Sequence, residues 1–273
     1  MRDDPQQPSF KNPPLVEVAI SIQFNPIPNF HVGFIGLLWG KYKDRYPLVE
    51  HKDPVVHSVE KTGLVNRATN APPTVHFSSE PTIPRIMFMD QDQGNFVQFQ
   101  KDRLIVNWRK HSEDSKYPRY STMRLSISHE YALFKKFLEE HDLAEVQVDQ
   151  LETTYVNHIE VGNRSIEEVF PHLLRDDLFN KNIELETFKL NYTHIIKSGE
   201  NFVGRLYTSI EKARRTQDGV EIFVLRFVGR CHPVGNQSDG VFSALDLIRE
   251  NVNSSFKSIT STKMHEFWKE DST

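Results

Sequence analysis

Aromatic rings and positive charges lie close together between residues 103 and 124. Such rings stack on nucleic-acid bases, and guanidinium groups pair with phosphates or anchor protein partners. The alternative interpretation is that the rings pack beneath a sheet while the charged groups extend into solvent. The candidate binding residues in this segment are Arg103, Asn107, Trp108, Arg109, Tyr117, Arg119 and Tyr120, and Lys110, His111 and Arg124 extend the same basic and aromatic patch.

Two further candidates lie in the strand that opens the second half of the chain. Tyr155 and Asn157 alternate with Val156 and His158 there, and Asn107 occupies a similar position in an apolar strand of the first half. A buried amide costs stability unless it is hydrogen-bonded. The two asparagines therefore either bridge neighbouring strands or line a ligand cleft. A second basic set comprises Arg205, Lys212, Arg214, Arg215, Arg226 and Arg230.

Catalytic and cofactor signatures are missing from the sequence. It has no Gly-Lys-Ser or Gly-Lys-Thr phosphate loop, no dinucleotide glycine fingerprint and no Gly-x-Ser-x-Gly elbow. The twelve histidines include no zinc-type pair after His129-Glu130, and Cys231 has no thiol near it. Cys231 and His232 are neighbours in an extended segment, where adjacent side chains point in opposite directions. We therefore expect no metal or other cofactor, and binding rather than catalysis.

Composition limits the compartment and the class of partner. The chain has 273 residues and a formal net charge of -4, without the overall basic excess of a general nucleic-acid binder. Its single cysteine excludes an internal disulfide framework and fits a reducing compartment. The polar, proline-rich first 14 residues do not resemble a secretory signal, and no apolar run has the roughly 20 residues that span a bilayer. We expect a flexible tail over residues 1–14, a cytoplasmic location and no membrane partner.

Hydrophobic periodicity predicts the elements of the first half, residues 15–150. Strict alternation predicts a strand over residues 15–24, and apolar spacing predicts a helix within 30–46. The proline-rich stretch 47–84 indicates short edge strands and loops. Strands follow at 85–89, 96–100 and 104–109, the last two joined by a turn at Lys101-Asp102, and an amphipathic helix ends near residue 141.

The second half, residues 151–273, has a similar order of elements. A strand is predicted over 148–161, and Ser165 with Glu168 forms a capping-box signature for a short helix through Leu174. Strands follow at 188–197, 202–212 and 220–229, with a hairpin turn at Asp218-Gly219. The last helix is predicted over 242–268, with Ser243 and Asp246 in capping positions.

This shared order, which is a strand, a helix, antiparallel strands and a long helix, predicts an α+β fold built from two duplicated units. We expect the two sheets to join edge to edge with the helices on one face, leaving the other face open.

Four short motifs resemble a sporadically distributed prokaryotic family of uncharacterised proteins that is known only by a family-model number. They span most of the chain in the family's order. The resemblance implies no catalytic residue or cofactor, and it suggests an accessory protein of mobile or defence-related bacterial regions. The stretch 47–84 departs from what is expected of the family. The motifs are Pro13-Pro14-Leu15-Val16-Glu17-Val18, Arg103 with Asn107-Trp108-Arg109, Tyr117-Pro118-Arg119-Tyr120 and Tyr155-Val156-Asn157-His158-Ile159.

Three functions follow as hypotheses. The first is a non-enzymatic binding protein that recognises a protein or peptide partner, as part of a bacterial defence or toxin-linked system; it is compatible with a homo-oligomer. The second is a nucleic-acid-binding protein that uses the patch from Trp108 to Arg124. The third is a small-molecule sensor or hydrolase with a cleft between the halves, where the sheet meets the long helices.

Overall fold

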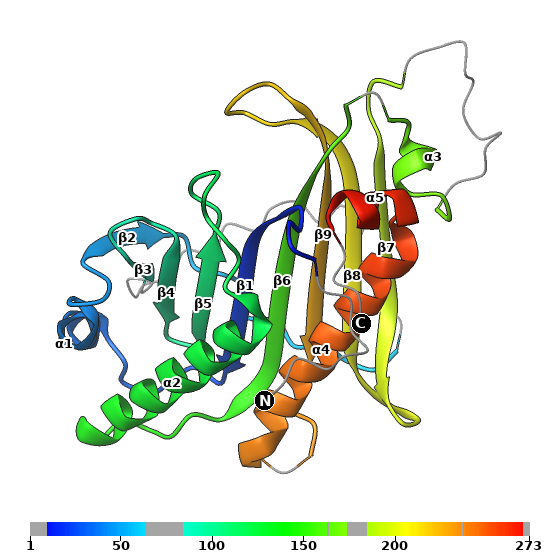
Figure 1. Ribbon diagram of the computed structural model, residues 1–273. Helices are drawn as coiled ribbons and strands as arrows, with labels where there is room; N and C mark the ends of the chain where they lie inside the picture. The colour runs from blue at the N-terminus through cyan, green and yellow to red at the C-terminus, as the bar shows by residue number, and fades with distance from the viewer. Residues whose placement is uncertain (1–9, 64–83, 163, 174–184, 236, 270–273) are drawn as a thin grey trace, which may run out of the picture.

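One antiparallel sheet organises the chain. The computed structural model describes residues 10–63, 84–162, 164–173, 185–235 and 237–269, and within these ranges it contains one nine-stranded sheet and five helices (Figure 1). The strand order is β2-β3-β4-β5-β1-β6-β9-β8-β7, and every neighbouring pair is antiparallel. The α+β class predicted from the sequence is therefore confirmed.

The strands and helices have the following bounds. The strands are β1 Leu15–Phe24, β2 Leu48–Lys52, β3 Arg85–Met89, β4 Asn95–Gln100, β5 Arg103–Arg109, β6 Val148–Glu160, β7 Lys189–Ser198, β8 Asn201–Arg214 and β9 Glu221–Cys231. The helices are α1 Val32–Tyr42, α2 Arg119–Glu140, α3 Ile166–Val169, α4 Gln237–Ile259 and α5 Thr262–Phe267. The expected boundary at residues 150 and 151 lies inside β6, which pairs with β1 along the middle of the sheet.

The central strand β1 is where the sequence alternation has its clearest structural effect. Val18, Ile20 and Ile22 alternate along the strand and are fully buried on the face that packs against helices. Ala19 and Ser21 point to the opposite face, as successive side chains of a strand must. The period of two thus assigns an apolar face to the helices and a more polar face to the other side.

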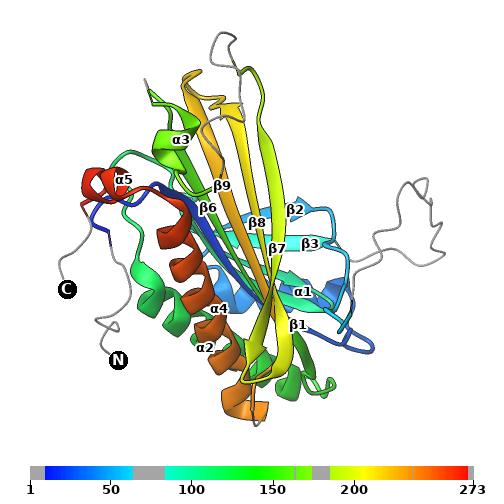
Figure 2. The same ribbon diagram turned by 90° about the vertical axis from the view of Figure 1, so that its right-hand side faces the viewer.

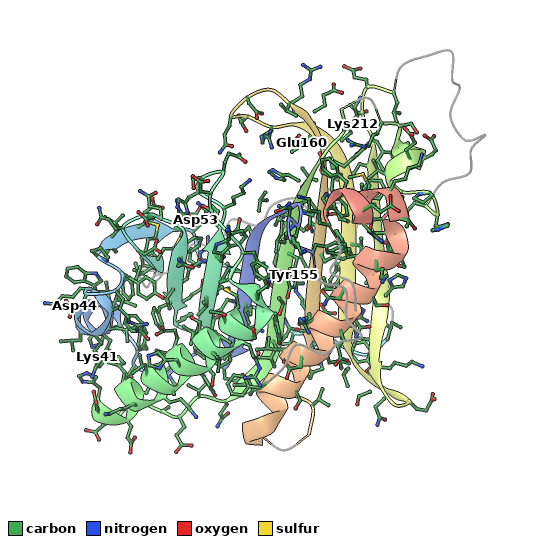
Figure 3. All side chains as sticks on the ribbon, in the orientation of Figure 1. Lys41, Asp44, Asp53, Tyr155, Glu160 and Lys212 are labelled. Carbon is green, nitrogen blue, oxygen red and sulfur yellow. The ribbon has the colours of Figure 1, made fainter. Side chains whose placement is uncertain are left out.

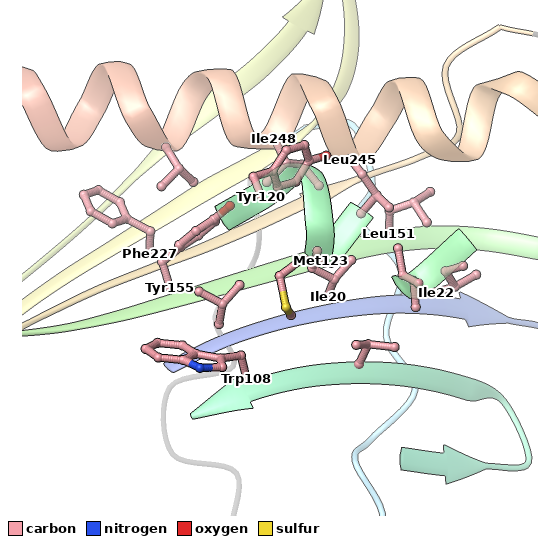
Figure 4. Close-up of a cluster of buried hydrophobic side chains, with 14 of the residues drawn as sticks. Ile20, Ile22, Trp108, Tyr120, Met123, Leu151, Tyr155, Phe227, Leu245 and Ile248 are labelled. Atoms are coloured by element: carbon pink, nitrogen blue, oxygen red, sulfur yellow. The ribbon is translucent and has the colours of Figure 1, made fainter. Parts of the chain in front are cut away.

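Helices α2 and α4 cover the same face of the sheet (Figures 1 and 2). Their buried side chains meet those of the strands in one hydrophobic core (Figure 4). Gly229 in β9 allows α4 to approach closely, because a Cβ atom there would lie 2.3 Å from Cγ2 of Ile248. Near β4 the core is aromatic: the ring of Phe134 from α2 lies 5.5 Å from Phe99 and 5.7 Å from Phe24.

The long final helix predicted from the sequence is in fact two helices. Thr260 bonds back to the carbonyl of Phe256 through its hydroxyl, and Ser261 then adopts an extended backbone conformation. Its hydroxyl accepts a hydrogen bond from the amide of Met264, which caps α5. The predicted capping positions of Ser243 and Asp246 were wrong, because α4 begins at Gln237 and both residues lie within it. The hydrogen bonds of the Thr260 and Ser261 hydroxyls therefore separate α4 from α5, although the apolar spacing in the sequence continues past them.

Smaller differences concern the short helix and the amino-terminal segment. The capping box of Ser165 and Glu168 is confirmed, but α3 ends at Val169, well before the predicted Leu174, which lies outside the described residues. Residues 1–9 of the expected flexible tail also lie outside the described residues. Phe10 is buried, with its ring 5.8 Å from that of Trp268, and the amides of Lys11 and Asn12 bond to backbone carbonyls of residues 269 and 268. In the described parts of the chain, no helix is long and apolar enough to cross a membrane.

Candidate binding site on the sheet face opposite the helices

A row of polar side chains crosses the sheet on the face away from α2 and α4. The register places Gln100 of β4 opposite Arg103 of β5, Arg103 opposite Gln23 of β1, and Gln23 opposite Gln150 of β6. All four are at least 95% buried. Neutral amides rarely fill a buried row unless their donors and acceptors find partners. Those partners come from a segment of the same chain.

Residues 53–63, which we call the strap, leave β2 and run across this polar row. The strap's first residue, Asp53, lies on the β2 side of the molecule (Figure 3), and its later residues contact β8 and β9. Gln100 pairs with the main chain of Val55, accepting from its amide and donating to its carbonyl at 2.8 Å each. The side-chain amide thus imitates the pairing of a neighbouring strand.

Two more glutamines hold the middle of the strap. Gln23 and Gln150 both donate to the carbonyl of Ser58, at 3.0 and 2.9 Å. Gln150 also accepts from the amide of Glu60 at 2.8 Å. Arg103 donates to Gln23 and reaches the carbonyl of residue 56 at 3.5 Å, and burial lowers the pKa of its guanidinium. These bonds recognise main-chain groups, which every sequence carries.

His57 adds a charged contact at the first half of the strap. Its Nδ1 lies 3.1 Å from Oδ2 of Asp102, and its Nε2 lies 3.0 Å from Oδ2 of Asp149. The ring of His57 therefore lies between the β4–β5 turn, which carries Asp102, and β6, which carries Asp149.

Glu60 provides the buried anchor of the strap. Its carboxylate pairs with the guanidinium of Arg205 and accepts from the hydroxyl of Tyr207 at 2.7 Å, and Arg230 lies 3.7 Å away. Burial acts to lower the pKa of Arg230, but the carboxylates of Glu152 and Glu60 outweigh burial and raise it. Arg205 also donates to the carbonyls of residues 61 and 63 at 2.8 and 2.6 Å. The side chains of Glu60 and Arg205 are only 6% and 5% exposed, so this is a fully desolvated ion pair.

The centre of the same face lies beside the strap and carries small side chains. Ala19, Thr154 and Val228 stand side by side in register on β1, β6 and β9, and all three are partly exposed. Glu152 and Arg230 form an ion pair at 2.6 Å between them and the strap. On the other side, Glu17, Val156 and Arg226 form the next row. This shallow surface is apolar in the middle and charged along its borders.

The candidate residues predicted from the sequence are divided between the two faces of the sheet. Trp108 is 5% exposed on the helix face, with its ring 5.4 Å from that of Tyr117, whereas the neighbouring Arg109 is exposed on the strap face and lies over the ring of Phe96. Arg103 and Asn107 are also on the strap face and buried. Asn107 accepts a bond from Gln98 at 2.6 Å and donates to Glu17 at 3.2 Å.

The remaining candidates lie in or near the interior between the sheet and the helices. Tyr155 is 6% exposed in the middle of the sheet (Figures 3 and 4), and burial raises its pKa to about 12. Tyr120 donates to Asp246 at 2.7 Å, and burial together with that carboxylate raises its pKa well above the usual value. Asn157 donates to the carbonyl of Leu225 and so acts as an inter-strand bridge. Arg119 donates to the carbonyl of residue 10 at 3.2 Å.

The sequence patterns did not single out most of the residues that hold the strap. Gln23, Gln100 and Gln150 are long amides on strands whose alternate positions are apolar, and this was the available signal. Arg205 and Arg230 belonged to the second basic set without a special role. His57 and Glu60 lie in the proline-rich stretch, where no periodicity exists to interpret.

Cys231 is buried opposite Leu151, and burial raises its pKa to about 12 from an ordinary value of 9. The neutral thiol should therefore resist alkylation by iodoacetamide at pH 8 in the folded protein and react within minutes in 6 M guanidinium. Because the folded thiol keeps a proton that the unfolded thiol releases, its contribution to stability is complete below pH 9 and is lost as the pH rises toward 12. Rapid labelling of the native protein, measured by intact mass, would contradict this burial.

No group of three or more metal-ligating side chains occurs in the part of the chain that the structure describes. Comparison with known proteins found no matching family model, no matching curated protein and no matching solved structure.

Proposed function

We propose that this chain is a non-enzymatic binding protein that holds an extended segment of a partner protein on the sheet face opposite the helices. The observation that carries the proposal is the strap, because this face already holds an extended chain segment through its main chain. Gln100, Gln23 and Gln150 make the contacts with backbone groups of Val55 and Ser58. Main-chain recognition gives affinity for a peptide, and nearby side-chain pockets give specificity.

In this proposal the partner segment binds to the sheet surface beside the strap. The row Ala19, Thr154 and Val228 is partly exposed and carries small side chains. This row would make apolar contacts with the partner segment. The charged side chains of Glu17 and Arg226 at its border would set the orientation of that segment. Burying a central apolar strip inside a polar rim is the usual anatomy of a protein interface.

The proposal includes internal duplication of the fold. Beginning at the central pair, the sheet continues as β1-β5-β4-β3 on one side and as β6-β9-β8-β7 on the other. The connections agree with this correspondence, because α1 and α3 follow β1 and β6, while α2 and α4 follow β5 and β9. The antiparallel β1–β6 pair would then contain a pseudo-twofold axis. The resemblance seen in the sequence motifs would place such a binding protein among accessory proteins of bacterial defence or toxin-linked systems.

The other two hypotheses receive less support from the geometry. The rings of Trp108 and Tyr120 are buried, so they present no flat surface on which bases could stack. Arg124 lies over the ring of Phe242 and 3.4 Å from Asp246. The interior between the sheet and the long helices is filled by core side chains such as Ile248, rather than shaped for a small molecule (Figure 4).

A peptide-library selection tests the proposal with a defined probe. Random 12-residue peptides are selected on the immobilised protein, and affinities of the selected peptides are measured by biolayer interferometry. Thr154→Arg, in the centre of the small-sided row, should weaken binding at least about tenfold, because it fills the surface with a charged side chain. Leu125→Arg, a matched change at a residue that is 71% exposed on α2, should leave binding unchanged.

Two outcomes would count against this function. Failure to select any peptide, or affinities that do not respond to Thr154→Arg, would remove the sheet face as the site. Binding of oligonucleotides that falls steeply with salt and is lost in Arg109→Ala would instead favour nucleic-acid recognition.

A further inference from the structure

Strand β7 forms one edge of the sheet, and the residues in its middle are exposed. It pairs with β8 on one side, and no other described strand lies on its second side (Figure 2). Thr193, His194 and Ile195 in its middle are all exposed, Ile195 by 60%. Its outer backbone groups can therefore accept another strand.

The middle of β7 lacks several of the features that protect sheet edges. Lys189–Ser198 contains no proline, glycine or acidic residue, and its regular pairing with β8 runs from Lys189 to Ile196 before a register shift. The opposite edge, β2, is half as long, and three of its five residues are Glu50, His51 and Lys52. Short, charged edges discourage strand addition. In β7 the two lysines, Lys189 and Lys197, lie near the ends, and residues 190–196 between them contain no lysine, arginine or carboxylate.

Under the internal duplication proposed above, the sheet order leaves a position beside β7 that no described strand fills. Counting outward from the central β1–β6 pair, β3 is the fourth strand on its side and β7 is the fourth on the other. Strand β3 is covered by the antiparallel strand β2. Among the described residues no strand covers β7 in the same way, so the sheet has five strands on one side and four on the other.

We propose that β7 pairs with β7 of a second copy of this chain, antiparallel and about a twofold axis at His194. A twofold axis perpendicular to the sheet keeps equivalent faces together, so each residue meets one of the same parity. This register places Thr193 opposite Ile195 of the second copy, and both side chains are exposed. Pairs of β-branched residues of this kind stabilise antiparallel strands.

Electrostatic repulsion between lysines favours the axis at His194 over an axis one residue earlier, at Thr193. A twofold axis at Thr193 would place Lys189 directly opposite Lys197 of the second copy, and like charges in that position are destabilising. The axis at His194 instead places Asn191 opposite Lys197. The five residues from 192 to 196 that form the centre of this pairing all lie before the register shift in β7. The inference draws on the proposed duplication for the comparison of β7 with β3, and it does not depend on the strap.

Cysteine crosslinking tests the register directly. Cys231 is buried, so a cysteine introduced on β7 would be the one accessible thiol among the described residues. In His194→Cys the two new thiols would face each other across the axis, and a disulfide dimer should form under mild oxidation. In Asn191→Cys the two positions would be six residues apart along the strands, about 20 Å, and no disulfide should form.

Sedimentation equilibrium tests the association itself. The full chain should show a concentration-dependent monomer–dimer equilibrium, and Ile195→Lys should raise the dissociation constant at least about tenfold. Val49→Lys, the matched change on β2 at a residue that is 42% exposed, should leave the equilibrium unchanged. Hydrogen exchange of the β7 amides reports the fold of both variants.

Each contrary outcome would overturn the proposal. A monomer at all concentrations, or equal crosslinking at residues 191 and 194, would exclude this twofold pairing. Slow exchange of the outer β7 amides in a purely monomeric sample would show that another part of the same chain occupies the edge. A dimer that responds to Val49→Lys but not to Ile195→Lys would place the interface at β2.

Discussion

Replacing Glu60 by alanine is expected to lower the free energy of unfolding by about 3–5 kcal/mol. The change leaves the Arg205 guanidinium buried without its carboxylate, and it removes the acceptor of the Tyr207 hydroxyl. A desolvated charge that loses its partner is far more costly than a lost surface ion pair. Urea unfolding followed by circular dichroism at pH 7 measures the difference.

The strap itself supplies the control. Val56 lies on the same segment but is 81% exposed, so Val56→Ala should change the free energy of unfolding by less than about 0.5 kcal/mol. Glu60→Ala should also speed hydrogen exchange at the amides of Val55 and Glu60, because these amides bond to the sheet only while the strap is seated. Equal stability of the two variants would show that the ion pair contributes little to seating the strap.

Replacing Phe134 by alanine should destabilise the fold by about 3–5 kcal/mol. The ring is 1% exposed and contacts the rings of Phe24, Phe30 and Phe99, which come from three different segments. Removing it leaves a cavity at the point where α2 meets the sheet, and neighbouring rings can fill that cavity only by leaving their own contacts. The same urea experiment measures the loss.

Leu125→Ala is the matched control for Phe134→Ala, because it removes a large apolar side chain from the exposed side of the same helix. Its expected effect is below about 0.5 kcal/mol, since leucine and alanine have similar helix propensities. A small loss in Phe134→Ala would mean that α2 does not depend on the aromatic cluster for its position on the sheet.

The strands were largely predictable because alternation is a local signal. The bounds of β1 and β3 match the predicted residues, and β4 and β5 match within one residue at each end. The same two-residue alternation explains why the candidate binding residues between 103 and 124 do not form one surface. Trp108 and Arg109 are adjacent in a strand, so they must point to opposite faces, and a cluster in the sequence cannot remain a cluster on β5.

The strap could not be predicted because its contacts are far apart in the sequence and its residues have no period. Glu60 and Arg205 are 145 positions apart, and Glu60 and His232 are 172 apart. No hydrophobic pattern relates residues at such separations, and prolines near the strap removed the usual strand signals. Only the long amides on β1, β4 and β6 indicated that something polar had to lie over them.

The route of the strap has a consequence for how the molecule comes apart. It is held by β4 at one end, by β1 and β6 in its middle, and by β8 and His232, which follows β9, at the other end. If the strands of one flank separated, the strap would lose its hydrogen bonds to that flank. Its contacts with the opposite flank would be weakened as a result. The two flanks of the sheet also adjoin along the β1–β6 pair and through contacts between α2 and α4. The strap adds a further connection between them, and we expect the flanks to unfold as one cooperative unit.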